Sequence, residues 1–519
     1  NNPDEEPAVA QFGKGDKYFG VATLMATLPG LPMFGHGQIE GFGEKYGMEY
    51  RRSYWDEPVD PALVERHERE IFPLLRKRHL FSEVDNFALY DVITEGGHVN
   101  EDVFAYSNMA GGERVLVVYN NRYAEAKGWV RRSVGMNVAG AGGRRVAHLS
   151  LSEGLKLSGD DRVYYLMEDF REGLQYLRKG ATLCSEGLMV NLGAFKSNVF
   201  MNFRELKDVD GQVKRLYEHL GGRGVPDVAS ELQELSLKGL LDPFRHAVSP
   251  DMLRKAVQAG RATGVAPDAF LDACAVFLGQ ARKHLCPGPG ERGADPVAET
   301  VNLLLRALFT LDKLKFRKSG DLAPAVEYVF SRLPRDVSAD LAWWRVPVLW
   351  AVLARVGALV EQRGVPERSR ALMDELLLGK AVKETLVSLG LDEGGAAWEI
   401  LLLEVLVRRQ GWGGEAAKEG LPRLVETLFA DRDAGALVGI NEFGGRVWFN
   451  RESFETLLHW LFTVSVIGSV TFPMGRMRVS TRVVLDNYQY VSALRRAAED
   501  SRYDVKEFVD NLERTGRSG

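Results

Sequence analysis

The stretch Thr27-Leu28-Pro29-Gly30-Leu31-Pro32-Met33-Phe34-Gly35 decides the fold that we expect for the N-terminal part of the chain. Its prolines and glycine predict a turn, and its continuous apolar residues predict a short buried strand, as in a parallel sheet covered on both faces. Helix-compatible spacing precedes the stretch over residues 8–26, and a second helical pattern runs from Pro61 to His79. Helix, buried strand and helix in succession are typical of an α/β fold.

The composition is that of an ordinary globular protein. The 519 residues are 45% hydrophobic and 26% charged, which excludes wholesale disorder and, at roughly 150 residues per domain, predicts about three or four domains. The formal net charge of -5 gives no electrostatic basis for binding nucleic acid. No apolar run of about 18 residues lacks a charge, so we expect no membrane span.

The cysteines and histidines point away from disulfides and metals. Cys184, Cys274 and Cys286 are far apart, and no C-x-x-C pair occurs. A disulfide framework or redox motif is therefore disfavoured, and we expect a reducing, cytoplasmic location. The nine histidines lack ligand spacing, so we predict no transition-metal site.

The pattern along the chain predicts a multidomain α+β protein with boundaries near residues 80, 206 and 434. Residues 81–206 hold short apolar runs bounded by Gly and Asn, which predict an antiparallel β-sandwich. Residues 207–434 are helical in pattern, and 435–519 predict a hairpin around Gly444-Gly445 followed by a helix. The strands predicted in the sandwich cover residues 87–92, 103–106, 114–119, 162–167, 188–192 and 198–203.

Asp4 is the main candidate for chemistry. It lies in the acidic run Asp4-Glu5-Glu6, whose carboxylates repel one another and are costly to bury. One interpretation is a solvated loop or a helix N-cap, since Asp before a helix accepts from free backbone N–H groups. The other is a carboxylate at the C-terminal end of a barrel strand, where α/β barrels place their chemistry.

Two short elements of the sequence are Asn1-Asn2-Pro3-Asp4-Glu5 and, after Phe12-Gly13, Leu28-Pro29-Gly30-Leu31-Pro32-Met33-Phe34-Gly35-His36-Gly37-Gln38. Together they resemble the α-amylase family, glycoside hydrolase family 13. The first is similar to the family's Asn-His-Asp element after barrel strand seven, and the second to its strand-eight element. The resemblance covers about the first 206 residues. It implies that residues 1–80 are the end of a partial (β/α)8 barrel, followed by the family's β-sandwich.

The resemblance also implies roles for single residues. Asp4 matches the family's third carboxylate, which stabilises the transition state, and Asn2, His36 and Gln38 match substrate-binding positions. Pro3 stands where the family has a histidine, so one sugar contact is missing or replaced.

The resemblance further implies a retaining enzyme of α-glucans, with calcium as a family cofactor whose ligands are not identifiable here. The nucleophile and the acid/base residue would precede residue 1. The chain is therefore expected to be the C-terminal part of a longer enzyme, inactive alone, with the upstream barrel portion as its partner.

The same residues allow other interpretations. His36 and Gln38 also suit a hydrogen-bond network that stabilises their loop. Trp55 suits a sugar platform, although burial is the commoner fate of a large aromatic residue. Core packing is expected for Trp343, Trp344 and Trp350, which occur at helical spacing. The same loop as Trp55 contains further aromatic and acidic residues, namely Glu40, Tyr46, Tyr50 and Tyr54.

Two rival functions stay open at this level. Pro3 is compatible with a non-catalytic relative that only binds glucans. The helical segment 207–434, about which the resemblance says nothing, is compatible with a protein-interaction scaffold.

Overall fold

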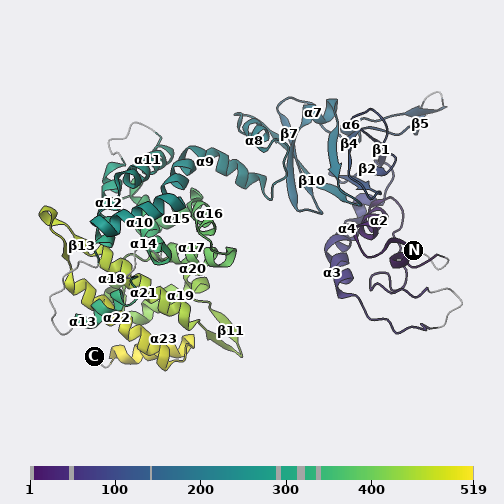
Figure 1. Ribbon diagram of the computed structural model, residues 1–519. Helices are drawn as coiled ribbons and strands as arrows, with labels where there is room; N and C mark the ends of the chain where they lie inside the picture. Colours follow the sequence, from purple (N-terminus) through teal and green to yellow (C-terminus); the bar gives the residue numbers. More distant parts are fainter. Residues whose placement is uncertain are drawn as a thin grey trace. The chain divides into compact units, whose positions relative to one another are not determined.

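The computed structural model describes residues 5–45, 52–140, 143–287, 294–311, 322–334 and 341–517. The chain divides into two compact units, the first ending at Leu235 and the second beginning at Ser236. Figure 1 shows that the first unit combines helices with a sheet, and that the second is built almost entirely of helices. The chain is thus a mixed α+β protein, and the boundaries expected at residues 80, 206 and 434 stay predictions.

An eight-stranded antiparallel sheet forms the centre of the first unit. Its strand order is β8-β7-β10-β3-β2-β1-β4-β9. The six strands predicted from the sequence all belong to this sheet. The strands are β1 (Ala88–Ile93), β2 (Val103–Ala110), β3 (Glu113–Asn120), β4 (Ala126–Ser133), β7 (Val163–Asp169), β8 (Leu174–Lys179), β9 (Leu188–Leu192) and β10 (Ser197–Lys207). A separate hairpin joins β5 (Met136–Gly140) to β6 (Gly143–Ala147).

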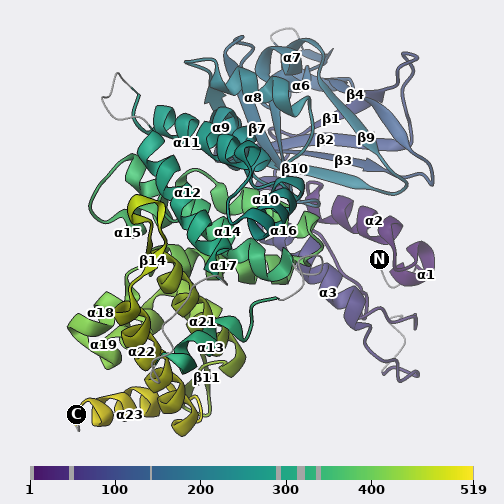
Figure 2. The same ribbon diagram turned by 60° about the vertical axis from the view of Figure 1, so that its left-hand side comes forward.

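The sheet curls around one core (Figure 2). Side chains from strands near opposite ends of the sheet, such as Val190 of β9 and Tyr165 of β7, share a single buried cluster. The short helices α6 (Leu151–Gly154) and α7 (Gly180–Ser185) contribute Leu151 and Leu183 to it. A sandwich of two separate sheets is therefore not confirmed, because one curled sheet provides both walls of the core.

Helices from the start of the chain cover the other face of the sheet. Phe19 and Ala22 of α2 pack in one cluster with Val117 of β3 and Val199 of β10. The helices are α1 (Ala8–Phe12), α2 (Asp16–Thr27), α3 (Pro61–Glu70), α4 (Phe72–Arg76) and α5 (Arg78–Phe81). The single helix expected over 61–79 is broken after Glu70, since Pro73 lacks the N–H that would continue the hydrogen-bond ladder.

The strand expected within residues 27–35 is wrong. This stretch is irregular, and the described part of the chain before Ala88 contains no strand. Leu31 is 94% exposed and Met33 is 55% exposed, so the apolar run is not buried here. Pro29 and Pro32 cannot donate to a ladder, and the run has no neighbouring strand to pair with. The barrel remnant is therefore not confirmed, and the helices α1 to α5 take its place.

The second unit is a helical assembly around one hydrophobic core. Helix α9 (Val228–Ala247) crosses the division between the units, and α8 (Gln212–Leu220) precedes it. Trp344 and Trp350 are buried in this core and Trp343 packs against it, which confirms the core prediction for these residues. The further helices are α10 (Pro250–Thr263), α11 (Asp268–Leu285), α12 (Asp295–Phe309), α13 (Ala323–Phe330), α14 (Leu341–Leu353), η2 (Val356–Leu359), α15 (Val365–Glu375), α16 (Leu378–Ser388), α17 (Glu393–Arg408), α18 (Trp412–Glu419), α19 (Leu421–Ala430), α20 (Arg432–Leu437), α21 (Arg451–Gly468), η3 (Pro473–Gly475), α22 (Thr481–Asp500) and α23 (Val505–Arg517).

The last part of the chain confirms the predicted hairpin and helix. Strands β11 (Asn441–Phe443) and β12 (Arg446–Trp448) pair around Gly444 and Gly445, and α21 follows. Both glycines have positive φ, which the tight turn requires. A second small hairpin, β13 (Val470–Thr471) with β14 (Arg478–Val479), was not predicted.

One segment, Leu341–Leu359, is long and apolar enough to cross a membrane by length and composition. In this structure 67% of it is buried within the protein.

Candidate functional site

The loop that carries Gln38 is closed by its own hydrogen bonds. The carbonyl of Gly37 accepts from the backbone N–H of Gly41 and Phe42, each at 2.9 Å. The side-chain Oε1 of Gln38 accepts from the N–H of Gly35 at 2.9 Å. Gly37 has φ +64°, and a Cβ there would lie 2.4 Å from the Phe42 ring, so glycine is required. Gln38 thus performs the loop-stabilising role that the sequence allowed, and it is 6% exposed.

A buried tyrosine and histidine fix this loop to two helices. The Tyr18 hydroxyl of α2 lies 3.1 Å from the Gln38 carbonyl and 2.9 Å from Nε2 of His67 on α3. Nδ1 of His67 lies 2.9 Å from the Leu63 carbonyl, which can only accept, so Nδ1 carries a proton. Burial lowers the pKa of His67 and raises the pKa of Tyr18 to about 12. Both groups are therefore neutral at pH 7, and the single Tyr18 proton is shared between two acceptors.

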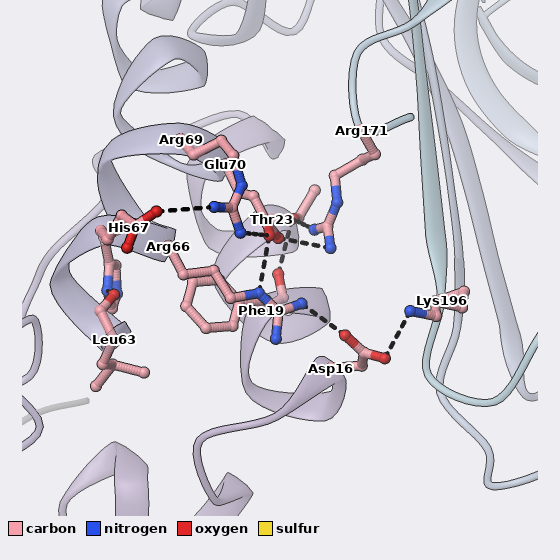
Figure 3. A network of polar contacts seen from close by, with 11 residues as sticks. Asp16, Phe19, Thr23, Leu63, Arg66, His67, Arg69, Glu70, Arg171 and Lys196 are labelled. Atoms are coloured by element: carbon pink, nitrogen blue, oxygen red, sulfur yellow. Dashed lines mark hydrogen bonds and ion pairs between the residues drawn. The ribbon is translucent and has the colours of Figure 1, made fainter. Parts of the chain in front are cut away.

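An ion-pair network ties the same helices to the loops beside the sheet (Figure 3). Arg66 of α3 lies 2.6 Å from Asp16 of α2 and 2.8 Å from Glu70. Arg171, which follows β7, lies 2.7 Å from Glu70, and Lys196, which precedes β10, lies 2.8 Å from Asp16. Burial alone would raise the pKa of Asp16, but Lys196 and Arg66 outweigh it and lower that pKa. Each carboxylate here is paired, so this network holds the helices in place and offers no free acid or base.

A small pocket lies beside the Gln38 loop. Its volume is about 180 Å³, and its polar lining residues are Glu5, Gln11, Tyr18 and Gln38. Apolar side chains of α1 and α2 form the remaining wall. The volume is below the roughly 300–1,000 Å³ of common ligand pockets, so the pocket holds at most a small part of a glucan chain.

The four predicted site residues meet different outcomes. Asn2 and Asp4 lie outside the described residues. Gln38 lines the small pocket, and His36 is exposed in the same loop with its ring 6.2 Å from that of Phe42. The structure thus places Gln38 at the pocket together with Glu5, the neighbour of Asp4 in sequence.

Two aromatic residues in the loop after Gln38, Tyr54 and Trp55, are more exposed than expected. Trp55 is 59% exposed and Tyr54 is 71% exposed, so the expected burial is wrong. The Glu44 carboxylate accepts from the backbone N–H of both residues, at 2.8 Å from Tyr54 and 3.1 Å from Trp55. This loop is therefore ordered through its backbone while its rings face solvent. Tyr46 and Tyr50 lie outside the described residues.

Sequence reasoning missed Tyr18 and His67. The signal available was a polar residue on the apolar face of each predicted helix, but the pairing of the two helices is not visible in the sequence. In the described ranges, no cluster of three or more His, Cys, Asp or Glu side chains could hold a metal ion.

Comparisons with known proteins give little further guidance. No protein-family model matches this chain, and no curated protein matches it. Among solved structures, it is similar to the α-amylase from Geobacillus thermoleovorans in complex with acarbose, at 14% identity and a TM-score of 0.26. The similarity covers 39% of this chain and 34% of the α-amylase, so the chain spans about a third of that protein. A likeness this weak leaves the function to be inferred from the residues themselves.

Proposed function

We propose that this chain is part of an α-amylase-like glycoside hydrolase that acts on α-linked glucans by a retaining mechanism. One observation supports the proposal: the last residue of each of the two elements that resemble the family lines the same pocket. Glu5, next to Asp4, and Gln38, the end of the strand-eight element, both line it although they are far apart in sequence.

Asp4 would act on the transition state and not as the nucleophile. A carboxylate that binds sugar hydroxyls strengthens its hydrogen bonds as the oxocarbenium ion develops, which can supply several kcal/mol. The nucleophile and the acid/base residue are not assigned to any carboxylate of this chain. In this proposal they belong to the upstream barrel portion.

Gln38 would hold one sugar hydroxyl through its amide nitrogen. Its Oε1 is engaged by Gly35, whereas its Nε2 donates no hydrogen bond to the part of the chain that the structure describes. An amide N–H₂ held in this way is a fixed donor. His36 and Asn2 would contribute to the same binding surface.

Exposed apolar side chains support a covering partner. Leu31, Met33 and Trp55 are large and exposed in the loops around Gln38. Exposed apolar residues mark an interaction surface when they form one patch, and the proposal takes these three residues as parts of such a patch. In the proposal the upstream barrel portion covers them.

The test is an activity assay on the protein that includes the upstream barrel portion. Asp4→Asn is expected to lower kcat on a maltooligosaccharide by about 100-fold or more, as for the loss of one transition-state contact. Glu6→Gln is the matched control, since Glu6 is a neighbouring exposed carboxylate, and its kcat should change by less than about threefold. Near-normal turnover of the Asp4 variant, an equal loss in the control, or glucan hydrolysis by the 519-residue chain alone would contradict the proposal.

A further inference from the structure

A larger pocket lies wholly within the helical unit. Its volume is about 500 Å³, in the range of small-molecule sites. Residues of α12, α14, α18, α21 and α22, together with the segment just before η2, line it. Nothing in the proposed glucan chemistry uses this pocket.

Arg355 gives the pocket an unpaired positive charge. It follows α14 and lines the pocket, and its Nε is buried without a hydrogen-bond partner. Within the described ranges, no carboxylate pairs with its guanidinium. Burial lowers the pKa of Arg355, with no charged group offsetting the effect. A half-buried, unpaired guanidinium is costly, and an oxyanion bound in the pocket would satisfy it through two parallel hydrogen bonds.

Asn487 adds an unpaired amide to the same pocket. Its residue is 6% exposed, and its side chain forms no hydrogen bond with the described part of the chain. Gly413 of α18 lies against it, and a Cβ at Gly413 would fall 1.9 Å from Oδ1 of Asn487. Only glycine leaves space for this amide, whose donor and acceptor remain available to a ligand.

The rim of the pocket supplies further groups that can form hydrogen bonds with the hydroxyl groups of a ligand. The Asp486 carboxylate is partly exposed, and its ion pair with the exposed Arg482 is long, at 3.6 Å. Ser480, before α22, makes no capping hydrogen bond with its side chain. Tyr490 presents an aromatic ring on the same wall, as sugar-binding sites commonly do.

We propose that this pocket binds a small hydroxylated organic anion, a sugar phosphate or a sugar acid. Arg355 holds the oxyanion, and Asn487, Asp486 and Ser480 hold the hydroxyl groups. The oxyanion is the chemistry that both ligand types share. The proposal is independent of the glucan assignment, because it rests on different residues in the other unit.

Calorimetric titration of the 519-residue chain tests the proposal. Four probes distinguish binding through the anionic group from binding through the sugar hydroxyls: glucose 6-phosphate, glucuronate, glucose and inorganic phosphate. Binding of either sugar anion, with glucose unbound and phosphate at least about tenfold weaker, supports it. The two sugar anions distinguish a phosphate from a carboxylate head. Absence of binding by both, binding of glucose with equal affinity, or equal binding of phosphate would overturn it.

Variants connect the binding to the named residues. Arg355→Met and Asn487→Ala should each lower the affinity for the sugar anion by about tenfold or more. Arg363→Met, at an exposed arginine of the same unit, should leave this affinity unchanged. Thermal unfolding gives a second readout. Without ligand, Arg355→Met should have a Tm equal to or above that of the wild type, because an unpaired charge is removed. The ligand should raise the Tm of the wild type but not of this variant. Unchanged affinity, or a lower ligand-free Tm for Arg355→Met, would overturn the proposal.

Discussion

His459 makes the stability of the helical unit depend on pH. It lies in α21 and is 1% exposed, with both ring nitrogens lacking partners among the described residues. The rings of Tyr328 and Trp460 pack against it, and the charge of Arg332 also disfavours its protonation. Burial therefore lowers the pKa of His459 to about 3.

The direction and size of the effect follow from that value. The folded-state pKa lies below the unfolded value of about 6.5, so the unfolded chain binds the proton first as the pH falls. Stability is thus complete above pH 6.5 and is lost toward pH 3, with a slope near 1.4 kcal/mol per pH unit. Between pH 8 and pH 5 this single group should cost about 2 kcal/mol of unfolding free energy.

Urea unfolding at pH 8 and pH 5, followed by tryptophan fluorescence, measures this loss. Seven of the nine tryptophans follow Ser236, so the signal reports mainly on the helical unit. His459→Phe should abolish about 2 kcal/mol of the pH dependence and change the stability at pH 8 by about 1 kcal/mol or less. His284→Gln, at an exposed histidine, should leave the dependence unchanged. Equal pH dependence in the wild type and His459→Phe would refute the reasoning.

Two further predictions concern packing and a buried ion pair, both measured by urea unfolding. Gly20→Ala should destabilise the protein by about 1–3 kcal/mol, because the new Cβ would lie 2.0 Å from the buried Tyr119 ring, whereas Gly239→Ala, with no atom within 4 Å, should be neutral or stabilising. Equal effects of the two would contradict this account. Arg345 and Glu399 form two hydrogen bonds of 2.7 Å in a buried setting, so Arg345→Met alone should cost about 3–5 kcal/mol. The double variant with Glu399→Leu should recover most of the loss, and a double variant as unstable as the single one would show that the pair is not the cause.

The strands of the sheet were predictable where their sequences are mostly apolar. Residues 114–119 and 162–167 have that character, and they form the central part of β3 and most of β7. Strand β4 was missed because Lys127, Gly128, Arg131 and Arg132 interrupt its pattern, with alternate positions facing solvent. The apolar run at 27–35 predicted a strand that the structure does not contain. A strand forms only when a partner strand satisfies the hydrogen bonds of its backbone.

The candidate sites were likewise predictable from the sequence only in part. The sequence predicted Gln38 as a site residue. The fold shows that its side-chain oxygen accepts from its own loop, while its side-chain nitrogen donates to no group in the described part of the chain. Arg355 and Asn487 carried no signal at all, because an arginine and an asparagine far apart in sequence are ordinary surface residues until the helices bring them to one pocket.

The sequence by itself determined much of the local structure: the helical character of residues 207–434, six of the eight sheet strands, and the turn at Gly444-Gly445. These depend on side-chain periodicity and backbone preference, which act over a few residues. Only the tertiary structure decided that the strands form one curled sheet, that Glu5 lies at a pocket with Gln38, and that Arg355 has no counter-ion among the described residues. Each of these three features depends on which distant segments of the chain pack together. Packing decides which side chains are buried and which charges are paired, so these properties cannot be read from local sequence.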